Sequence, residues 1–265
     1  MKEPHTKQIL VVNGKGGCGK TTIATNLAAC YACMGHSVSL KDQDSQASSS
    51  QWHAVRHHDL AAVTLIEAHQ RNAMYETRAY QTRSMVNSDY IIIDSPSVFT
   101  DAQLTELLKN TDAILIPVLP SSIDIRVGAR FIADLLTHRT YRARPIPVGV
   151  IANRVKLNSS SHAKLKHFLE CLDVPAIATL RDSYIYTRMA EDGTGIFDTN
   201  DEGSDQEAAQ WRALIGWLDE QMSQQATRPL SNVSGSTHRG PKSVLRGDQT
   251  PKEPSQNQDM SRAHA

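Results

Sequence analysis

The sequence has no apolar run that approaches the roughly 20 residues of a membrane-spanning helix, and its first residues lack the apolar core of a secretory signal. Four cysteines in 265 residues make no disulfide framework. Charges balance at 28 Lys and Arg against 28 Asp and Glu, so overall charge selects neither nucleic acid nor membrane as a partner. These absences predict a cytoplasmic protein without a membrane anchor.

The last 40 or so residues lack aromatic side chains. Residues 226–265 contain no Phe, Trp or Tyr and are rich in Ser, Pro, Gln and charged residues. Such a segment buries too little apolar surface to offset the entropy lost on ordering. We therefore predict a folded domain over residues 1–225 and a disordered polar tail over 226–265. The mild excess of Lys and Arg in the tail leaves two interpretations, an inert solvated segment or an arm that contacts a partner.

The most informative feature that is present is a glycine-rich stretch near the start. Residues 14–22 read Gly-Lys-Gly-Gly-Cys-Gly-Lys-Thr-Thr, which fits the phosphate-loop pattern G-x-x-x-x-G-K-[ST], and they lie between an apolar run and a helical pattern. Glycines let backbone N–H groups turn toward an anion, and the helix N-terminus adds partial positive charge. The pattern predicts that Lys20 contacts the outer phosphates and that Thr21 ligates Mg²⁺. The residues expected at the nucleotide are Gly16, Gly17, Cys18, Gly19, Lys20, Thr21 and Thr22.

Short apolar runs alternate with helix-compatible segments along the rest of the chain. The runs predict strands at 9–12, 37–40, 63–66, 90–93, 113–117, 147–152 and 174–179. Beyond the helix that follows the phosphate loop, helices are predicted at 45–56, 71–86, 101–110, 122–138, 160–171 and 205–224. This alternation indicates an α/β fold, a mostly parallel twisted sheet with helices on both faces, whose ligands bind at the carboxyl ends of the strands.

Acidic residues stand at two of those strand ends. Asp94 follows the run Tyr-Ile-Ile-Ile, the position at which an aspartate holds Mg²⁺ beside a phosphate loop. Asp42 and Asp44 end the second predicted strand. Phosphoryl transfer needs in-line positioning and neutralised charge, which carboxylates, a metal ion and lysines supply. These positions therefore predict hydrolysis of the bound nucleotide.

The string Lys15-Gly-Gly-Cys-Gly-Lys20-Thr-Thr resembles the deviant Walker A motif of the ParA/MinD family of P-loop ATPases. In that family the early lysine reaches the partner's nucleotide across a dimer, so the resemblance implies that Lys15 and Lys20 are catalytic in a homodimer that forms on ATP binding. A solvated loop lysine is the alternative for Lys15. The Asp42-Gln-Asp44 segment resembles the family's Asp-x-Asp, which implies that Asp44 polarises the attacking water and that Asp42 and Asp94 lie in the magnesium shell.

The resemblance covers about residues 8–220, with departures. Serines replace a threonine and a proline of the family within 95–97, and Ser45 replaces a proline, so the backbone there is less restricted. Asn153 and Arg154 follow an apolar run, as in the family's adenine-recognition segment, and Asn153 has an amide that can pair with a base edge. A polar loop start explains this pair equally well.

The resemblance implies a short ParA-type ATPase that uses ATP and Mg²⁺, binds nonspecific DNA of the nucleoid, and positions a plasmid, a chromosome region or a large protein assembly. A cargo adaptor protein would stimulate its slow hydrolysis. A tail without an apolar face disfavours a membrane helix. Two rivals stay open, a metabolic ATP-dependent ligase or synthetase of the same fold, and a nucleotide switch that recruits a partner. The candidate DNA contacts are Arg126, Arg130, Arg139, Arg142, Arg144, Lys164, Lys166, Arg181 and Arg188.

Overall fold

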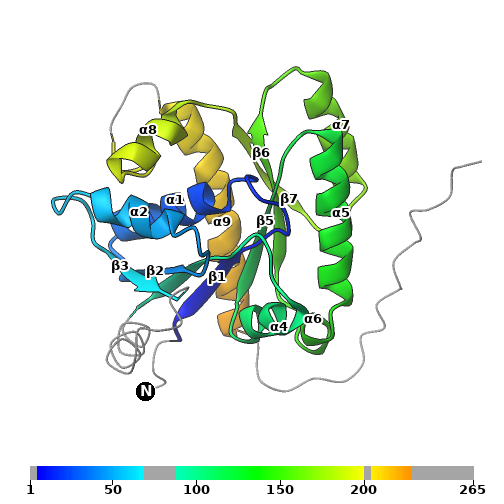
Figure 1. Cartoon of the computed structure of the whole chain (residues 1–265), viewed down its shortest axis with the longest axis horizontal. Coiled ribbons are helices and arrows are strands. Elements are labelled where there is room, and N and C mark those ends of the chain that lie inside the picture. The colour runs from blue at the N-terminus through cyan, green and yellow to red at the C-terminus, as the bar shows by residue number, and fades with distance from the viewer. Residues whose placement is uncertain (1–4, 69–87, 200–203, 228–265) are drawn as a thin grey trace, which may run out of the picture. The chain divides into compact units, whose positions relative to one another are not determined.

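The computed structural model describes residues 5–68, 88–199 and 204–227. These residues form a sheet of seven strands: β1 Lys7–Val11, β2 Val38–Asp42, β3 Val63–Glu67, β4 Tyr90–Asp94, β5 Ala113–Val118, β6 Val148–Val155 and β7 Ala176–Arg181. The order across the sheet is β3-β2-β4-β1-β5-β6-β7, and every neighbouring pair is parallel (Figure 1). Because β1 lies at the centre, the segment that follows it lies at the middle of the carboxyl edge.

Helices cover both faces of this sheet (Figure 1). Their bounds are α1 Lys20–Cys33, α2 Ser48–Val55, α4 Asp101–Lys109, α5 Ser122–Thr137, α6 Arg139–Ala143, α7 Ser160–Glu170, α8 Ile185–Asp192 and α9 Asp205–Thr227. Apolar side chains of α1, α2, α8 and α9 pack into one core cluster, and those of α4, α5 and α7 pack into a second. Among the described residues, no helix combines the length and the apolar character that crossing a bilayer requires.

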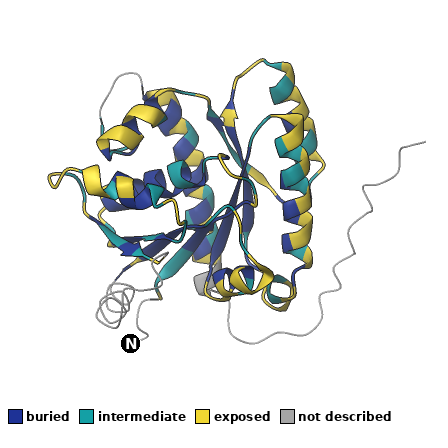
Figure 2. Ribbon diagram, in the orientation of Figure 1, coloured by how far each residue is buried: buried dark blue, intermediate teal, exposed yellow. Residues whose placement is uncertain are grey.

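The central strands are buried on both faces, as Figure 2 shows by their dark colour. In β1, Ile9 and Val11 point into the first cluster, whereas Leu10 points into the second. In β4, Ile92 and its neighbour Ile93 divide in the same way. Successive side chains of a strand point to opposite faces, so a strand that is covered twice must be apolar at every position. This is why these runs show no polar alternation.

The predicted fold class is confirmed, with all seven predicted strands present in one parallel sheet. The helix predicted at 71–86 and most of the predicted tail lie outside the described residues, and α9 ends two residues beyond the predicted domain boundary at 225. The sequence did not predict α6 or α8, which have five and eight residues. The helix predicted from residue 45 begins at Ser48, because hydrogen bonds to Asp42 and Asp44 hold a turn before it.

The end of α2 is fixed by a buried ion pair. Arg56 donates from Nη1 and Nη2 to the two carboxylate oxygens of Asp198, at 2.7 and 2.9 Å, and the two side chains are 5% and 1% exposed. Arg56 also donates to the carbonyls of Ala61 and Gly193. One turn earlier, Trp52 Nε1 donates to the carbonyl of Thr194 at 3.0 Å. The pair therefore ties α2 to the segment that follows α8.

We predict that Arg56→Ala destabilises the fold by about 3–5 kcal/mol, because it leaves Asp198 as an uncompensated buried charge. Urea unfolding followed by circular dichroism measures this loss. The double variant Arg56→Ala/Asp198→Ala is the control, and it should cost less than the sum of the two single variants because it removes both charges. If the two single variants lose free energies of unfolding that sum to the loss of the double variant, Arg56 and Asp198 do not stabilise the fold as a pair.

Candidate functional site

The glycine-rich loop leaves the end of β1 and is anchored to β5. Asn13 Nδ2 donates to the carbonyl of Pro117 at 2.7 Å, and its Oδ1 accepts from the N–H of Lys15 at 3.1 Å. Gly19 stands at the N-cap of α1, where none of the described side chains caps the helix. The first N–H groups of a helix have no partner within it. The loop therefore presents an uncapped helix N-terminus at the middle of the carboxyl edge, which suits an anion.

Position 19 requires glycine because of its backbone conformation and because the side chain of Asn153 lies close to it. Gly19 adopts φ +96°, which glycine alone adopts at little cost, and a Cβ at this position would lie 2.2 Å from Nδ2 of Asn153. Asn153 is buried and donates from Nδ2 to the carbonyl of Cys18 at 2.8 Å. It lies where the register of β6 and β7 shifts between Ala152 and Val155. The structure thus gives Asn153 a place in holding the loop, and its contact with adenine stays a prediction.

Lys20 is buried inside the loop. Its side chain is covered by protein, and Nζ donates to Ser97 Oγ at 2.8 Å and to the carbonyl of Lys15 at 3.3 Å. Ser97 belongs to the segment that follows β4, and Gly16 lies beside it. A buried ammonium held by two neutral acceptors has no counter-charge among them, so it favours an anion. The position of Lys20 fits its predicted contact with phosphate.

Asp94 ends β4 and is fully buried. Its Oδ2 accepts from Thr21 Oγ1 at 2.8 Å and from Ser49 Oγ at 2.6 Å. Burial raises the pKa of Asp94 to about 6, although the hydrogen bonds from Ser49 and Thr21 oppose this shift. The Asp94 carboxyl therefore costs more to ionise than one in water, and the nearby charge of Lys20 offsets part of this cost.

These groups fit a hard divalent cation. Asp94 Oδ1 is buried and has no hydrogen-bond partner within the described part of the chain, an arrangement that buried polar atoms rarely keep without a ligand. The Thr21 hydroxyl lies beside the same carboxylate. Carboxylate and hydroxyl oxygens are the donors that Mg²⁺ prefers. The donor set thus fits the predicted magnesium ion, with Thr21 and Asp94 as the residues that would hold it.

Asp42 and Asp44 occupy different settings. Asp42 pairs in register with Asp94 across β2 and β4, but Oδ2 accepts from the N–H and hydroxyl of Ser50, and Oδ1 accepts from the N–H of Asp44. Its carboxylate therefore fastens the start of α2, and its place in a magnesium shell stays a prediction. Asp44 is half-buried, and its Oδ1 accepts from the N–H of Gln46 at 3.0 Å. Asp44 therefore lies in the turn before α2, and its predicted contact with the attacking water stays a prediction.

Lys15 lies at the rim of the site. Its side chain is 42% exposed, and Nζ lies 3.9 Å from Oδ1 of Asp124, in the first turn of α5. Arg154 is paired with Asp182 at 3.1 Å after β7, and its contact with adenine stays a prediction. Cys18 is buried, and its thiol donates to the carbonyl of Lys15 at 3.1 Å.

The structure also adds residues that the sequence analysis did not select. Ser49 donates to Asp94, and Asn13 braces the loop. Ser49 is the middle of three consecutive serines, and no pattern distinguishes it from Ser48 or Ser50 until α2 is placed. Asn13 lies between the apolar run and Gly14, the first glycine of the phosphate-loop pattern. This position was the sequence feature that could have identified it.

Comparison with known proteins agrees with this geometry. The family model described as "CobQ/CobB/MinD/ParA nucleotide binding domain" matches residues 9–194, well over half of the chain. "Maintenance of carboxysome distribution protein A" of Halothiobacillus neapolitanus is 28% identical over 198 residues, which are 74% of this chain and 88% of the relative. The fold resembles that of an ATP complex of McdA from Cyanothece, with a TM-score of 0.62 at 17% identity over 86% of this chain and 99% of that one. A plasmid partition protein of Borrelia burgdorferi bound to AMPPNP has a TM-score of 0.59 at 19% identity, over 80% of this chain and 99% of that one.

We predict that Gly19→Ala costs more stability than Gly35→Ala. Both glycines have positive φ, of +96° and +88°, but a Cβ at Gly35 meets nothing within 4 Å, whereas one at Gly19 meets Asn153. The close contact should add about 1–3 kcal/mol to the shared backbone cost. Urea unfolding of the two variants measures the difference. Adding Asn153→Ala to Gly19→Ala should recover part of it, and equal costs for the two glycine variants would contradict this account.

Proposed function

Since this chain belongs to the CobQ/CobB/MinD/ParA nucleotide-binding family, we propose that it is a short ParA-type ATPase that positions a large cargo on DNA. It is a P-loop ATPase of the MinD/ParA group. The observation that carries the proposal is the convergence of Lys20, Thr21 and Asp94 at one buried point, with Lys15 at its rim.

In the proposed reaction the residues of the site divide the work. Lys20 exchanges its neutral acceptors for the outer phosphates of ATP, and the N-terminus of α1 adds partial positive charge. Thr21 and Asp94 would hold Mg²⁺, which would supply neutralising charge to the phosphates when bound. Asp44 lies in the turn before α2 and orients the attacking water. Little covalent chemistry is needed, because phosphoryl transfer depends on positioning and charge.

Exposed apolar side chains at the same edge support the proposed dimer. Val98, Ile123, Leu157 and Tyr184 are 87%, 62%, 52% and 79% exposed. Each follows the carboxyl end of a strand, from β4 to β7, on the side of the sheet where Lys15 lies. Large apolar side chains that gather on one surface are typical of interaction sites. A second copy that covers this edge would bury them and would bring its own Lys15 to the nucleotide.

The relatives guide the proposed cargo. Two of them, 28% and 27% identical to this chain, carry the name "Maintenance of carboxysome distribution protein A". We therefore favour a large protein assembly over a small-molecule substrate, with an adaptor protein that stimulates hydrolysis.

The proposed DNA contacts lie on α5, α6 and α7. Two of the nine basic candidates already serve the fold, because Arg144 donates to Asp112 and to two main-chain carbonyls and Arg181 is bonded to Gln206. The exposed candidates on these three helices are Arg126, Arg130, Arg139, Arg142, Lys164 and Lys166. Helix α5 packs against both α6 and α7, so these side chains share one layer (Figure 1).

We predict that Asp44→Ala binds ATP and accumulates as a dimer, while its phosphate release falls by about 100-fold or more, the loss typical of removing one transition-state contact. Lys15→Gln should bind ATP and remain a monomer, because it lacks the charge that reaches the partner. Light scattering after gel filtration and steady-state phosphate release measure both properties. The controls are Lys109→Gln and Lys20→Ala. Lys109 ends α4 just before the start of β5, away from the carboxyl edge, and is 52% exposed against 42% for Lys15, so its variant should behave as wild type, whereas Lys20→Ala should not bind ATP. A Lys15→Gln protein that dimerises normally would contradict the role of this lysine.

We predict that the ATP-bound dimer binds duplex DNA in a salt-sensitive way, and that Lys164→Gln/Lys166→Gln weakens this binding. Each phosphate contact that is lost should lower the slope of log affinity against log salt by about 0.9. Fluorescence anisotropy with random-sequence duplexes measures the slope, and Arg212→Gln on α9, in the opposite helical layer, is the control.

The same assays test the rivals. If the ATP-bound wild type does not bind DNA at about 50 mM salt, where phosphate contacts are strong, the positioning function is wrong. Turnover far above about 1 per second without a partner would favour a ligase or synthetase. Binding without phosphate release under any condition would favour a nucleotide switch.

A further inference from the structure

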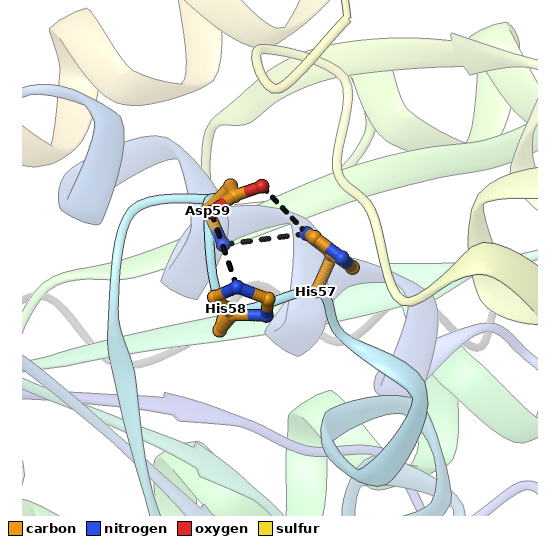
Figure 3. Close-up of side chains that lie close together, drawn as sticks. All are labelled: His57, His58 and Asp59. Carbon is orange, nitrogen blue, oxygen red and sulfur yellow. Dashed lines mark hydrogen bonds and ion pairs between the residues drawn. The ribbon is translucent and has the colours of Figure 1, made fainter.

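Three consecutive exposed residues after α2 bring metal-binding atoms together. His57, His58 and Asp59 each offer one ligand atom, and these atoms lie within 4.8 Å of one another (Figure 3). Asp59 is central, because its Oδ2 lies 3.3 Å from Nδ1 of His57 and its Oδ1 lies 3.3 Å from Nε2 of His58. The two imidazole rings lie 4.3 Å apart between centroids. Each carboxylate oxygen thus faces one imidazole nitrogen.

Nδ1 of His57 and the carboxylate of Asp59 both have lone pairs on the sides that face each other. The N–H of Asp59 donates to Nδ1 of His57 at 3.4 Å, so the lone pair of this nitrogen points toward Asp59. The same nitrogen lies beside the Asp59 carboxylate. A cation placed between these two lone pairs would be bound by both atoms.

The backbone of these residues is held at both ends. Arg56, the preceding residue, is fixed by Asp198, and its Nε and Nη2 donate to the carbonyl of Ala61 at 3.2 and 2.8 Å. Between these points, the N–H of Leu60 donates to the carbonyl of His57 at 3.2 Å. A loop that is closed across four residues by a buried side chain presents its donors with less entropy to lose on binding. Only the three side chains need to adjust.

We propose that His57, His58 and Asp59 form a His₂Asp site for a divalent transition-metal ion such as Zn²⁺ or Ni²⁺. Bonds of about 2.0–2.2 Å to such an ion place its ligands about 3–4 Å apart, close to the spacing present in the loop. Imidazole nitrogens favour these metals over Mg²⁺, whose ligands are oxygens. The site is therefore chemically distinct from the all-oxygen set at Asp94. Three protein ligands leave a coordination position for water or for a side chain of another molecule.

Calorimetric titration of Zn²⁺, and separately of Ni²⁺, into the nucleotide-free full chain tests the proposal, with millimolar Mg²⁺ present throughout. We expect one equivalent to bind, and His57→Gln/His58→Gln to bind it at least tenfold more weakly. Asp59→Asn should lose affinity in the same direction. The matched control is His162→Gln/His167→Gln, which removes two histidines from α7 and should leave the affinity unchanged. All three ligands are exposed, so the variants should unfold at the wild-type temperature without metal.

Exposed thiols provide the competing explanation, because Cys33 and Cys171 are exposed and thiolates bind zinc. A Cys33→Ser/Cys171→Ser variant should retain the affinity if the proposal holds. The proposal is overturned if the affinity follows the cysteines or the α7 histidines, if Mg²⁺ at millimolar concentration displaces the ion, or if the His57→Gln/His58→Gln variant binds as tightly as wild type.

Discussion

The carboxylate of Asp94 is the point on which the arrangement of the site depends. It ends a strand that is buried on both faces, and its Oδ2 accepts hydrogen bonds from Thr21 of α1 and Ser49 of α2. Three elements therefore meet at one atom. Burial raises the pKa of this carboxyl to about 6, although two hydrogen bonds and the charge of Lys20 oppose the shift, so ionising this acid costs more than it would in water. A metal ion and the phosphates it neutralises would relieve a cost that the protein itself creates.

The sheet explains why these groups converge. Since β1 is central, its neighbours are β4 on one side and β5 on the other, and both deliver residues to the loop that follows β1. From β4 come Asp94 and the segment with Ser97, which holds Lys20. From β5 come the carbonyl that braces Asn13 and, beyond it, Asp124 beside Lys15. Parallel strands make this possible, because all their carboxyl ends lie at one edge.

The fold and the phosphate loop could be predicted from the sequence because both depend on the pattern of residues close together in the chain. Doubly buried strands give uninterrupted apolar runs, and the glycine positions follow from backbone conformation. The finer geometry depends on contacts between residues far apart in the chain. Asn153, which donates to the carbonyl of Cys18, lies where the register of β6 and β7 shifts, and Arg154 donates to Asp182. Composition and spacing do not reveal a register shift between strands. They also do not reveal which of the three consecutive serines donates to Asp94.

Helix α2 joins the two regions with the richest chemistry, and its two ends are held differently. At its start, the hydroxyls of Ser49 and Ser50 contact Asp94 and Asp42, groups that surround the proposed metal and phosphates. At its end, Arg56 is locked by a bidentate buried pair and by main-chain carbonyls. The start of α2 is thus held by hydrogen bonds from the Ser49 hydroxyl and from the N–H and hydroxyl of Ser50, whereas movement at the far end must break a buried ion pair at a cost of several kcal/mol. Coupling between two binding sites requires that one ligand shift the surroundings of the other, and the Arg56–Asp198 pair opposes such a shift at the residues that follow Arg56.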